Sequence, residues 1–426
     1  MAHHVRNDRF QVFKLKFKKG SVRKSLYFSI SDGLFTAMMQ GVSESYLIAY
    51  GIALGATRSQ IAFLATAPAL LASFLQLKSA RLTQTIGSRT KLINFTVFFH
   101  ALSWLPIILI PYLFLKPSAL PWALLVAVIL FMSFGAFAVP AWQSLMSDYI
   151  PVKKRGKYFG WRNRLQGMFT VIISVSAGLI LHYFGKSDIR GFTVIFVFAM
   201  ICRFLAWVCL TQMAEPFRHT AHDAYFSFID FISQIRTSNF VKFVIFVSIM
   251  SLSVNISAPL LAVFLLKDLG LSYAEFMGVV TIASIACFLF QTSFGRAADR
   301  LGNLRVLKIA GWGIAIIPML WMISRNLFFI FFIQFLAGAV WGGFNLLVAN
   351  FMMEAVSPQK RIRCISYFNV VNSISIFLGA ILGGFAIQKL PPLFGYSYLS
   401  LFLLSCVCRV LVMFFVSGKI KEVRQF

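Results

Sequence analysis

Long apolar runs dominate the pattern of hydrophobic and polar positions in this chain. A run of about 20 apolar residues is long enough to cross a bilayer as a helix. Twelve runs approach or exceed that length, and they predict an all-α membrane protein with twelve spanning helices. The predicted spans are 26–50, 58–77, 92–114, 121–145, 165–185, 191–213, 240–266, 273–294, 304–323, 327–352, 366–388 and 396–417.

Composition supports this interpretation. Of 426 residues, 59% are hydrophobic and 12% are charged, whereas a soluble domain has about 25% charged residues. A water-soluble enzyme and an extended disordered chain are therefore excluded. The six cysteines form no CxxC pair, so neither a disulfide framework nor a metal site is predicted.

The net charge of +27 raises the question of a nucleic-acid partner. If both ends of the chain lie on one side of the membrane, the tails and loops of that side hold most of the 40 Lys and Arg residues. The positive-inside rule then places both termini in the cytoplasm and the protein in the cytoplasmic (inner) membrane. The basicity is explained by topology, and no nucleic-acid partner is expected.

The second half of the chain repeats the first. Gln291 repeats Gln76 at one constant spacing, and Arg409 repeats Arg203 at another. Two copies of a six-span unit in the same orientation are typical of secondary transporters. The predicted organisation is a basic tail (1–25), a first half (26–213), a cytoplasmic linker (214–239), a second half (240–417) and a short tail (418–426).

Two arginines, Arg203 and Arg409, lie inside predicted spans, where an unpaired charge is costly. Asp148 and Glu354 are as far apart in the sequence as Arg203 and Arg409 are, and they lie at the ends of spans four and ten. The sequence therefore predicts two symmetric ion pairs, Asp148–Arg203 and Glu354–Arg409.

A short motif between spans eight and nine identifies a family. Residues 295–305 resemble the GxxxDRxGxxR signature of the major facilitator superfamily, and 147–163 resemble an uncharacterised bacterial branch of it. The first half carries a decayed copy with Gln84 in place of Asp299. The resemblance implies two pseudo-symmetric six-helix halves, alternating access and a monomer. It also implies a conformational lock at Gly295, Asp299, Arg300, Gly302 and Arg305.

The residue types allow that role. Gly295 and Gly302 permit a tight turn, and a carboxylate such as Asp299 can bind a helix N-terminus or a neighbouring arginine. The alternative is an ordinary turn with topology-setting charge.

A transport cavity is expected near the midplane between the halves, where the resemblance places spans one, four, seven and ten. Polar side chains recur on single helix faces there and on spans five and eleven. Hydrogen bonding between helices is the alternative explanation. The predicted cavity residues are Gln40, Trp142, Gln143, Gln166, Asn255, Gln334, Trp341, Asn345, Asn369 and Asn372.

Two acids are predicted to couple transport to protons. Glu44 lies well inside a predicted span, and the repeat supplies no acid opposite it. An intramembrane carboxylate can carry a proton; a substrate contact or a structural role is the alternative. Asp32 is closer to the cytoplasmic end and is predicted as a second coupling site or a gate, with a simply solvated carboxylate as the alternative.

These features predict a secondary active transporter of a small uncharged or zwitterionic organic solute, driven by protons, with the lipid bilayer as its surroundings. No phosphate-binding loop or hydrolase motif is present, so no cofactor or enzymatic activity is expected. A non-transporting sensor or assembly partner and a drug or metabolite efflux pump are the alternatives. Uptake and export both remain open.

Overall fold

The computed structural model describes residues 19–112, 116–184, 188–215, 227–233, 238–271 and 273–422. Helices account for most of them, and no strand is present within these ranges. The predicted N-terminal tail lies largely outside the described residues, as does much of the linker. The linker's described part includes the short helix α10 (Phe228–Ser233).

The first half contains nine α-helices within the described ranges. They are α1 (Lys19–Gly41), α2 (Glu44–Ala53), α3 (Arg58–Leu75), α4 (Ser79–Ile86), α5 (Arg89–Leu102), α6 (Trp104–Leu109), α7 (Leu120–Tyr149), α8 (Arg155–Phe184) and α9 (Ile189–Thr211).

The second half follows the same plan after the linker. Its described helices are α11 (Asn239–Asn255), α12 (Leu261–Val263), α13 (Tyr273–Leu301), α14 (Asn303–Leu320), α15 (Leu327–Ala355), α16 (Arg361–Lys389) and α17 (Ser397–Phe415).

Ten helical segments of the described chain are long and apolar enough to cross a membrane. The first two predicted spans are not among the ten. The run 26–50 is divided between α1, which ends at Gly41, and α2, which begins at Glu44. α1 also begins in a basic segment, which lowers its mean hydropathy.

Several helices begin earlier or end later than their apolar runs. α8 begins at Arg155 rather than near 165, α16 begins at Arg361 rather than 366, and α13 continues to Leu301 rather than 294. Helical hydrogen bonds continue past the edge of an apolar run wherever polar side chains find partners. The extensions carry basic residues into the bundle.

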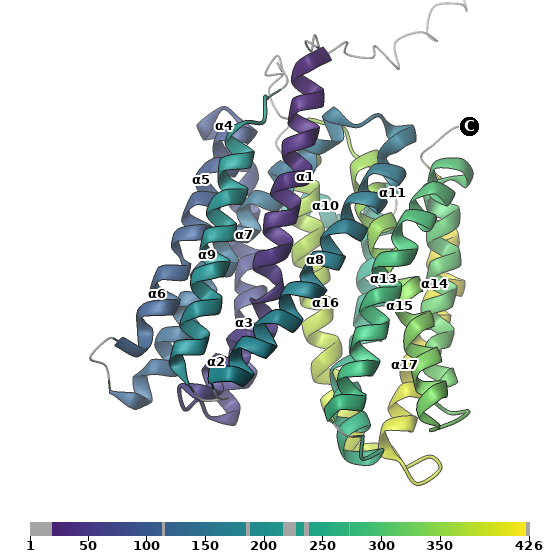
Figure 1. Ribbon diagram of the computed structural model, residues 1–426. Coiled ribbons are helices and arrows are strands. Elements are labelled where there is room, and N and C mark those ends of the chain that lie inside the picture. The colour runs from purple at the N-terminus through teal and green to yellow at the C-terminus, as the bar shows by residue number, and fades with distance from the viewer. Residues whose placement is uncertain are drawn as a thin grey trace, which may run out of the picture.

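Both described ends of the chain lie at the same end of the bundle (Figure 1). Asn239, at the start of α11, exchanges hydrogen bonds with the backbone of Lys421, and Ser25 of α1 accepts one from Ala214 after α9. We call this the basic end, because the loops before α8 and α16 and the first turns of α5 and α14 bring Lys and Arg to it. The other is called the opposite end.

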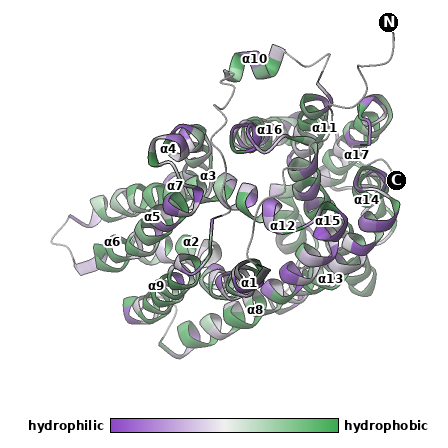
Figure 2. Ribbon diagram, turned by 90° about the horizontal axis from the view of Figure 1, so that it is seen from above, coloured by the Kyte–Doolittle hydropathy of each residue, from purple (hydrophilic) through white to green (hydrophobic). Residues whose placement is uncertain are grey.

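Each half has its own apolar core. Tyr50 and Trp104 lie in one core of the first half, and Phe243 and Phe351 stack in the second, with ring centroids 4.2 Å apart. A further core at the basic end joins the halves, with Met353 of α15 packed among residues of α5, α7 and α8. α8 also packs along α13, and α16 packs against α3 and α7 (Figure 2).

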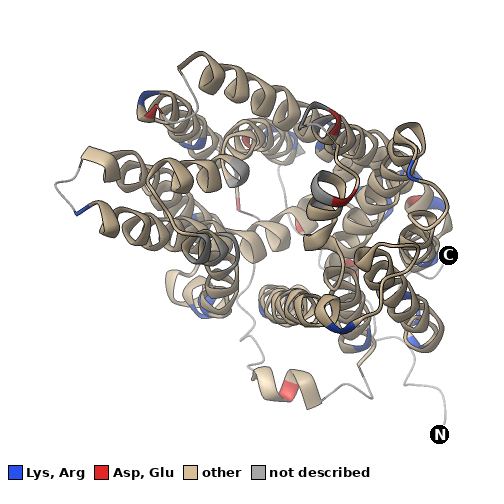
Figure 3. Ribbon diagram, turned by 90° about the horizontal axis from the view of Figure 1, so that it is seen from below, with Lys and Arg blue, Asp and Glu red and all other residues tan. Residues whose placement is uncertain are grey.

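The described helices expose many large apolar side chains, including Leu179, Phe328 and Phe385. Lys, Arg, Asp and Glu occupy only short stretches of the ribbon (Figure 3). Soluble monomers rarely expose so much apolar surface, so the outside of the bundle is suited to lipid.

Candidate functional site

Two glycines bring the halves into backbone contact at the basic end. A Cβ atom added to Gly156 of α8 would lie 2.2 Å from the carbonyl oxygen of Gly295 in α13. A Cβ added to Gly295 would lie 2.1 Å from the carbonyl oxygen of Gly156. Because α13 continues to Leu301, Gly295 lies inside a helix and not in the predicted turn. That turn is made by Gly302, whose φ of +97° suits glycine.

Asp299 connects the same two helices. Its carboxylate accepts hydrogen bonds from the backbone N–H groups of Gly156 (3.2 Å) and Lys157 (2.7 Å) at the start of α8. A helix N-terminus attracts negative charge because its first N–H groups have no partners within the helix. Asp299 thus binds a helix N-terminus of the other half. Arg300 and Arg305, also predicted for the lock, are exposed to solvent.

The decayed copy in the first half makes an equivalent contact. Arg363, near the start of α16, donates a hydrogen bond to Gln84 of α4 at 3.3 Å. Asn369 of α16 donates to Gln76 at 2.8 Å. The halves are therefore joined by two related contacts, one through an acid and one through an amide.

Asp148 lies between arginines of different halves. Its carboxylate is 2.7 Å from Arg89 of α5 and 3.4 Å from Arg361 of α16. Arg361 also donates to the hydroxyl of Ser147. Arg155, the counterpart of Arg361 in the repeat, donates to the carbonyl oxygen of Met353 in the second half at 3.2 Å. Each arginine thus reaches into the opposite half.

The predicted pair Asp148–Arg203 is therefore wrong. The extension of α16 places Arg361 beside Asp148. Arg203 lies deeper in the first half and donates to Nδ1 of His100 (2.9 Å) and Oγ1 of Thr36 (2.8 Å).

The predicted pair Glu354–Arg409 is also wrong. Arg409 donates instead to the carbonyl oxygens of Ile314 (3.0 Å) and Val254 (3.4 Å) and to the hydroxyl of Ser257 (3.2 Å). α17 directs Arg409 into the core of its own half, toward α11 and α14 and away from Glu354 at the end of α15.

Glu215 extends the network at the basic end. Its carboxylate accepts hydrogen bonds from the backbone N–H of Arg89 (3.1 Å) and from Nε of Arg89 (3.0 Å). Burial alone would raise the pKa of Glu215, but hydrogen bonds from Ser88 and Arg89 outweigh that effect and lower it. Glu215 thus fixes the start of the linker to the start of α5.

A buried polar cluster lies between α1 and α8. Asp32 of α1 is 3.5 Å from Arg162 of α8, and Arg162 donates to Gln166 at 3.0 Å. The guanidinium of Arg162 lies 4.6 Å from the ring centroid of Trp142. Thr36 donates to Asp32 at 3.3 Å, which links this cluster to Arg203.

Arg162 is not among the predicted site residues, because the pattern of apolar runs places it in a cytoplasmic loop. One signal was available. Gln166 follows Arg162 by four residues, and four residues along a helix place two side chains on the same face. Glu44 is the first residue of α2, and its side chain lies outside the described part of the chain, so its predicted role stays a prediction.

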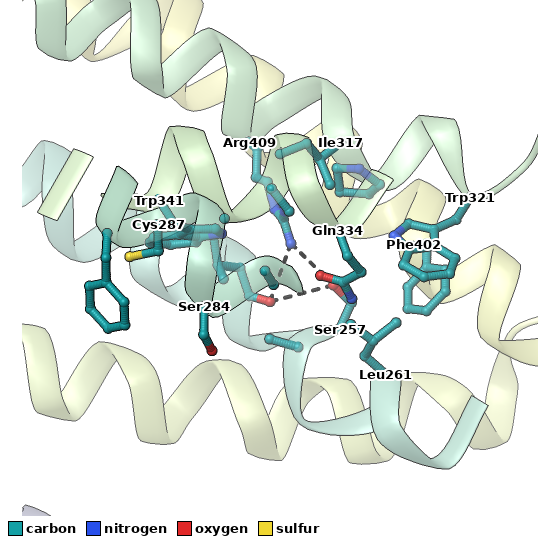
Figure 4. A pocket seen from close by; sticks show the side chains of 17 residues that line it. Ser257, Leu261, Ser284, Cys287, Ile317, Trp321, Gln334, Trp341, Phe402 and Arg409 are labelled. Carbon is teal, nitrogen blue, oxygen red and sulfur yellow. Dashed lines mark hydrogen bonds between the residues drawn. The ribbon is translucent and has the colours of Figure 1, made fainter. Parts of the chain in front are cut away.

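A cavity of about 330 Å³ opens inside the second half. Its lining includes the polar side chains of Arg409, Gln334, Ser257, Ser284 and Trp341, and Arg409 points toward Ser257 (Figure 4). All of its lining residues lie between 254 and 409. The cavity was predicted between the halves; this one lies within the second half.

Of the ten predicted cavity residues, Gln334 and Trp341 line this cavity. The others lie elsewhere, because most amides find nearer partners. Gln166 donates to the carbonyl oxygen of Gly33, and Asn255 donates to its own helix. Asn369 bonds Gln76 and Trp142 faces Arg162, as described above. Gln40 and Asn345 are exposed, while Gln143 and Asn372 are partly buried.

The described residues contain no group of three His, Cys, Asp or Glu side chains that could hold a metal ion.

Known proteins resemble this chain in sequence and in fold. The model of the Major Facilitator Superfamily matches residues 28–251 and again 243–425. The efflux pump azaK of Aspergillus niger is 31% identical over 110 residues, which cover 26% of this chain and 23% of the pump.

Three solved structures share the fold at low sequence identity. A bacterial homologue of the iron transporter ferroportin, in an outward-facing state, has a TM-score of 0.71 at 12% identity and covers 92% of this chain and 97% of its own. The E. coli fucose:proton symporter FucP has a TM-score of 0.70 at 11% identity, and the match covers 94% of this chain and 100% of FucP. The proton:xylose symporter XylE has a TM-score of 0.69 at 12% identity, and the match covers 94% of this chain and 97% of XylE.

Proposed function

The chain belongs to the major facilitator superfamily, and from that premise we propose that it is a secondary active transporter of a small organic solute, coupled to protons. It is a multi-pass membrane protein. We assign it to the cytoplasmic membrane with twelve spans, and its basic end to the cytoplasm, because Lys and Arg concentrate on cytoplasmic loops.

The contact of Asp299 with the start of α8 is the observation that carries this proposal. In alternating access, one end of the bundle closes while the other opens. The contacts that join the halves at the basic end include several that can be made and broken. Among them are two hydrogen bonds to Asp299, one ion pair between Arg361 and Asp148, and one close glycine contact. Such contacts suit a reversible gate.

Asp32 is our proposed proton site. Protonation would remove its charge and weaken its ion pair with Arg162. Arg162 lies on α8, the helix whose start forms the gate with α13. A proton on Asp32 would thus act on the helix that opens the gate. Glu44 remains the second candidate for coupling.

The test begins with binding and continues to transport. A ligand that binds the folded state raises its apparent melting temperature. We would screen sugars, amino acids, carboxylates and amides against the purified protein, and then measure the flux of each binding solute into proteoliposomes under an imposed pH gradient. A transporter accumulates the solute, whereas a non-transporting sensor binds it without flux.

The Asp32→Asn variant should lose accumulation driven by the pH gradient and keep exchange of labelled for unlabelled solute. Asp32→Glu retains the charge and should retain accumulation. Equal accumulation by Asp32→Asn and the native protein would contradict the assignment of Asp32.

Export is the second candidate function. The segment shared with the fungal efflux pump supports it, although that segment covers a quarter of this chain. Faster flux from the basic side outward than inward would favour export.

A further inference from the structure

Arg409 is a buried cation without an acidic partner among the described residues. It is 5% exposed, and its three acceptors are two backbone carbonyls and one hydroxyl, all uncharged. Its Nε–H has no hydrogen-bond partner there. An ionised group in an apolar interior is costly unless its charge is balanced.

The equivalent position in the first half is arranged differently. Arg203 is linked through Thr36 to the carboxylate of Asp32, by bonds of 2.8 Å and 3.3 Å. In the repeat, the place of Asp32 is taken by Val247. The second half therefore keeps the arginine and lacks the acid.

The space beside Arg409 is the cavity of about 330 Å³ (Figure 4). We propose that this cavity binds the carboxylate of a small organic solute, with Arg409 as its charged partner. This inference rests on the proposed function and specifies its substrate class. It replaces the uncharged or zwitterionic solute expected from the sequence with a solute that carries a carboxylate.

The chemistry of the lining favours a monocarboxylate. A guanidinium binds a carboxylate through short, charge-assisted hydrogen bonds. One arginine balances one negative charge, whereas a phosphate dianion would leave an excess charge in the membrane. Gln334 and Ser284 can bind further polar atoms of the solute, and Trp321 and Phe402 offer aromatic faces to an apolar body.

The experiment compares acids with their neutral amides of the same shape. Lactate and benzoate, each paired with lactamide and benzamide, are titrated into the detergent-purified protein while the melting temperature is followed. We expect at least one acid to raise the melting temperature and its amide to leave it unchanged. The amide controls for apolar partitioning into the cavity or the detergent.

Arg409→Gln should weaken binding of that acid by about tenfold or more, because it removes a charge-assisted contact. Arg409→Lys keeps the charge and should bind with intermediate strength. Cys406→Ala, one turn earlier on α17 and outside the cavity lining, is the matched control and should bind like the native protein. The acid–amide comparison in the native protein needs no variant, so it stands even if Arg409→Gln does not fold.

Four results would overturn the proposal. Equal binding of acid and amide, or of the native protein and Arg409→Gln, would show that Arg409 does not recognise the carboxylate. Binding of sugars or other neutral solutes without any acid would reject the carboxylate and leave the transporter proposal standing. Binding of no solute at all would count against both.

Discussion

Asp148 is the carboxylate through which arginines of both halves are neutralised. Arg89 lies 2.7 Å from one of its oxygens and Arg361 lies 3.4 Å from the other, and all three side chains are buried. Two buried guanidinium groups share this carboxylate, and Arg89 has a second carboxylate partner in Glu215 at 3.0 Å.

Asp148→Asn should therefore destabilise the protein by about 3–5 kcal/mol, the usual cost of removing one partner from a buried ion pair. The measurement is thermal unfolding in detergent. Asp188→Asn is the control, since Asp188 pairs with Arg190 at 2.8 Å where Arg190 is 79% exposed. It should leave the melting temperature unchanged. A similar melting temperature for both variants would disprove the central role of Asp148.

At the scale of elements, the approach of α8 to α13 depends on having no side chain at their crossing. Glycine also controls a second crossing, where a Cβ on Gly383 of α16 would lie 2.0 Å from the carbonyl oxygen of Ile256. The adjacent Gly384 faces open space, with no atom within 4 Å of an added Cβ. Close packing of α16 therefore requires glycine at position 383 and not at position 384.

Gly295→Ala should separate α8 from α13, because the new methyl group would overlap the backbone of Gly156. We expect faster hydrogen exchange at the start of α8 and reduced transport. Gly384→Ala adds the same methyl group to open space and should change neither. Unchanged exchange in Gly295→Ala would mean that the helices tolerate the extra volume and that their contact does not limit the gate.

At the scale of the whole molecule, the two halves form separate cores that meet closely at the basic end. In the transport cycle that we propose, the polar contacts between the halves would contribute to the equilibrium between open and closed forms. A carboxylate at a helix N-terminus contributes about 0.3–1 kcal/mol, and up to about 2 kcal/mol where it is partly buried.

Asp299→Asn should shift this equilibrium toward a basic end that is open, by roughly fivefold for a contribution of about 1 kcal/mol. Distances between spin labels on the exposed Arg81 and Arg300 would report the shift, after replacement of the six native cysteines. Asp230→Asn on α10, outside the gate, is the control. An identical distance distribution in Asp299→Asn would remove Asp299 from the lock.

Sequence alone determined the class of the protein, because apolar runs of spanning length are stable as helices in lipid. It also determined the two-fold repeat. For Asp299 it offered a helix N-terminus or a neighbouring arginine, and the tertiary structure places the carboxylate on the backbone N–H groups of Gly156 and Lys157. The signature motif resembles that of the superfamily to which the chain belongs.

Tertiary structure decided which charged side chains meet. Asp148 pairs with Arg89 and Arg361 instead of Arg203, and Arg409 faces a cavity instead of Glu354. Repeat spacing locates a residue along its helix, but an arginine side chain is long enough to reach several neighbouring helices. Its partner depends on where each helix begins and how it is rotated, and both are set by packing between helices that are distant in the sequence.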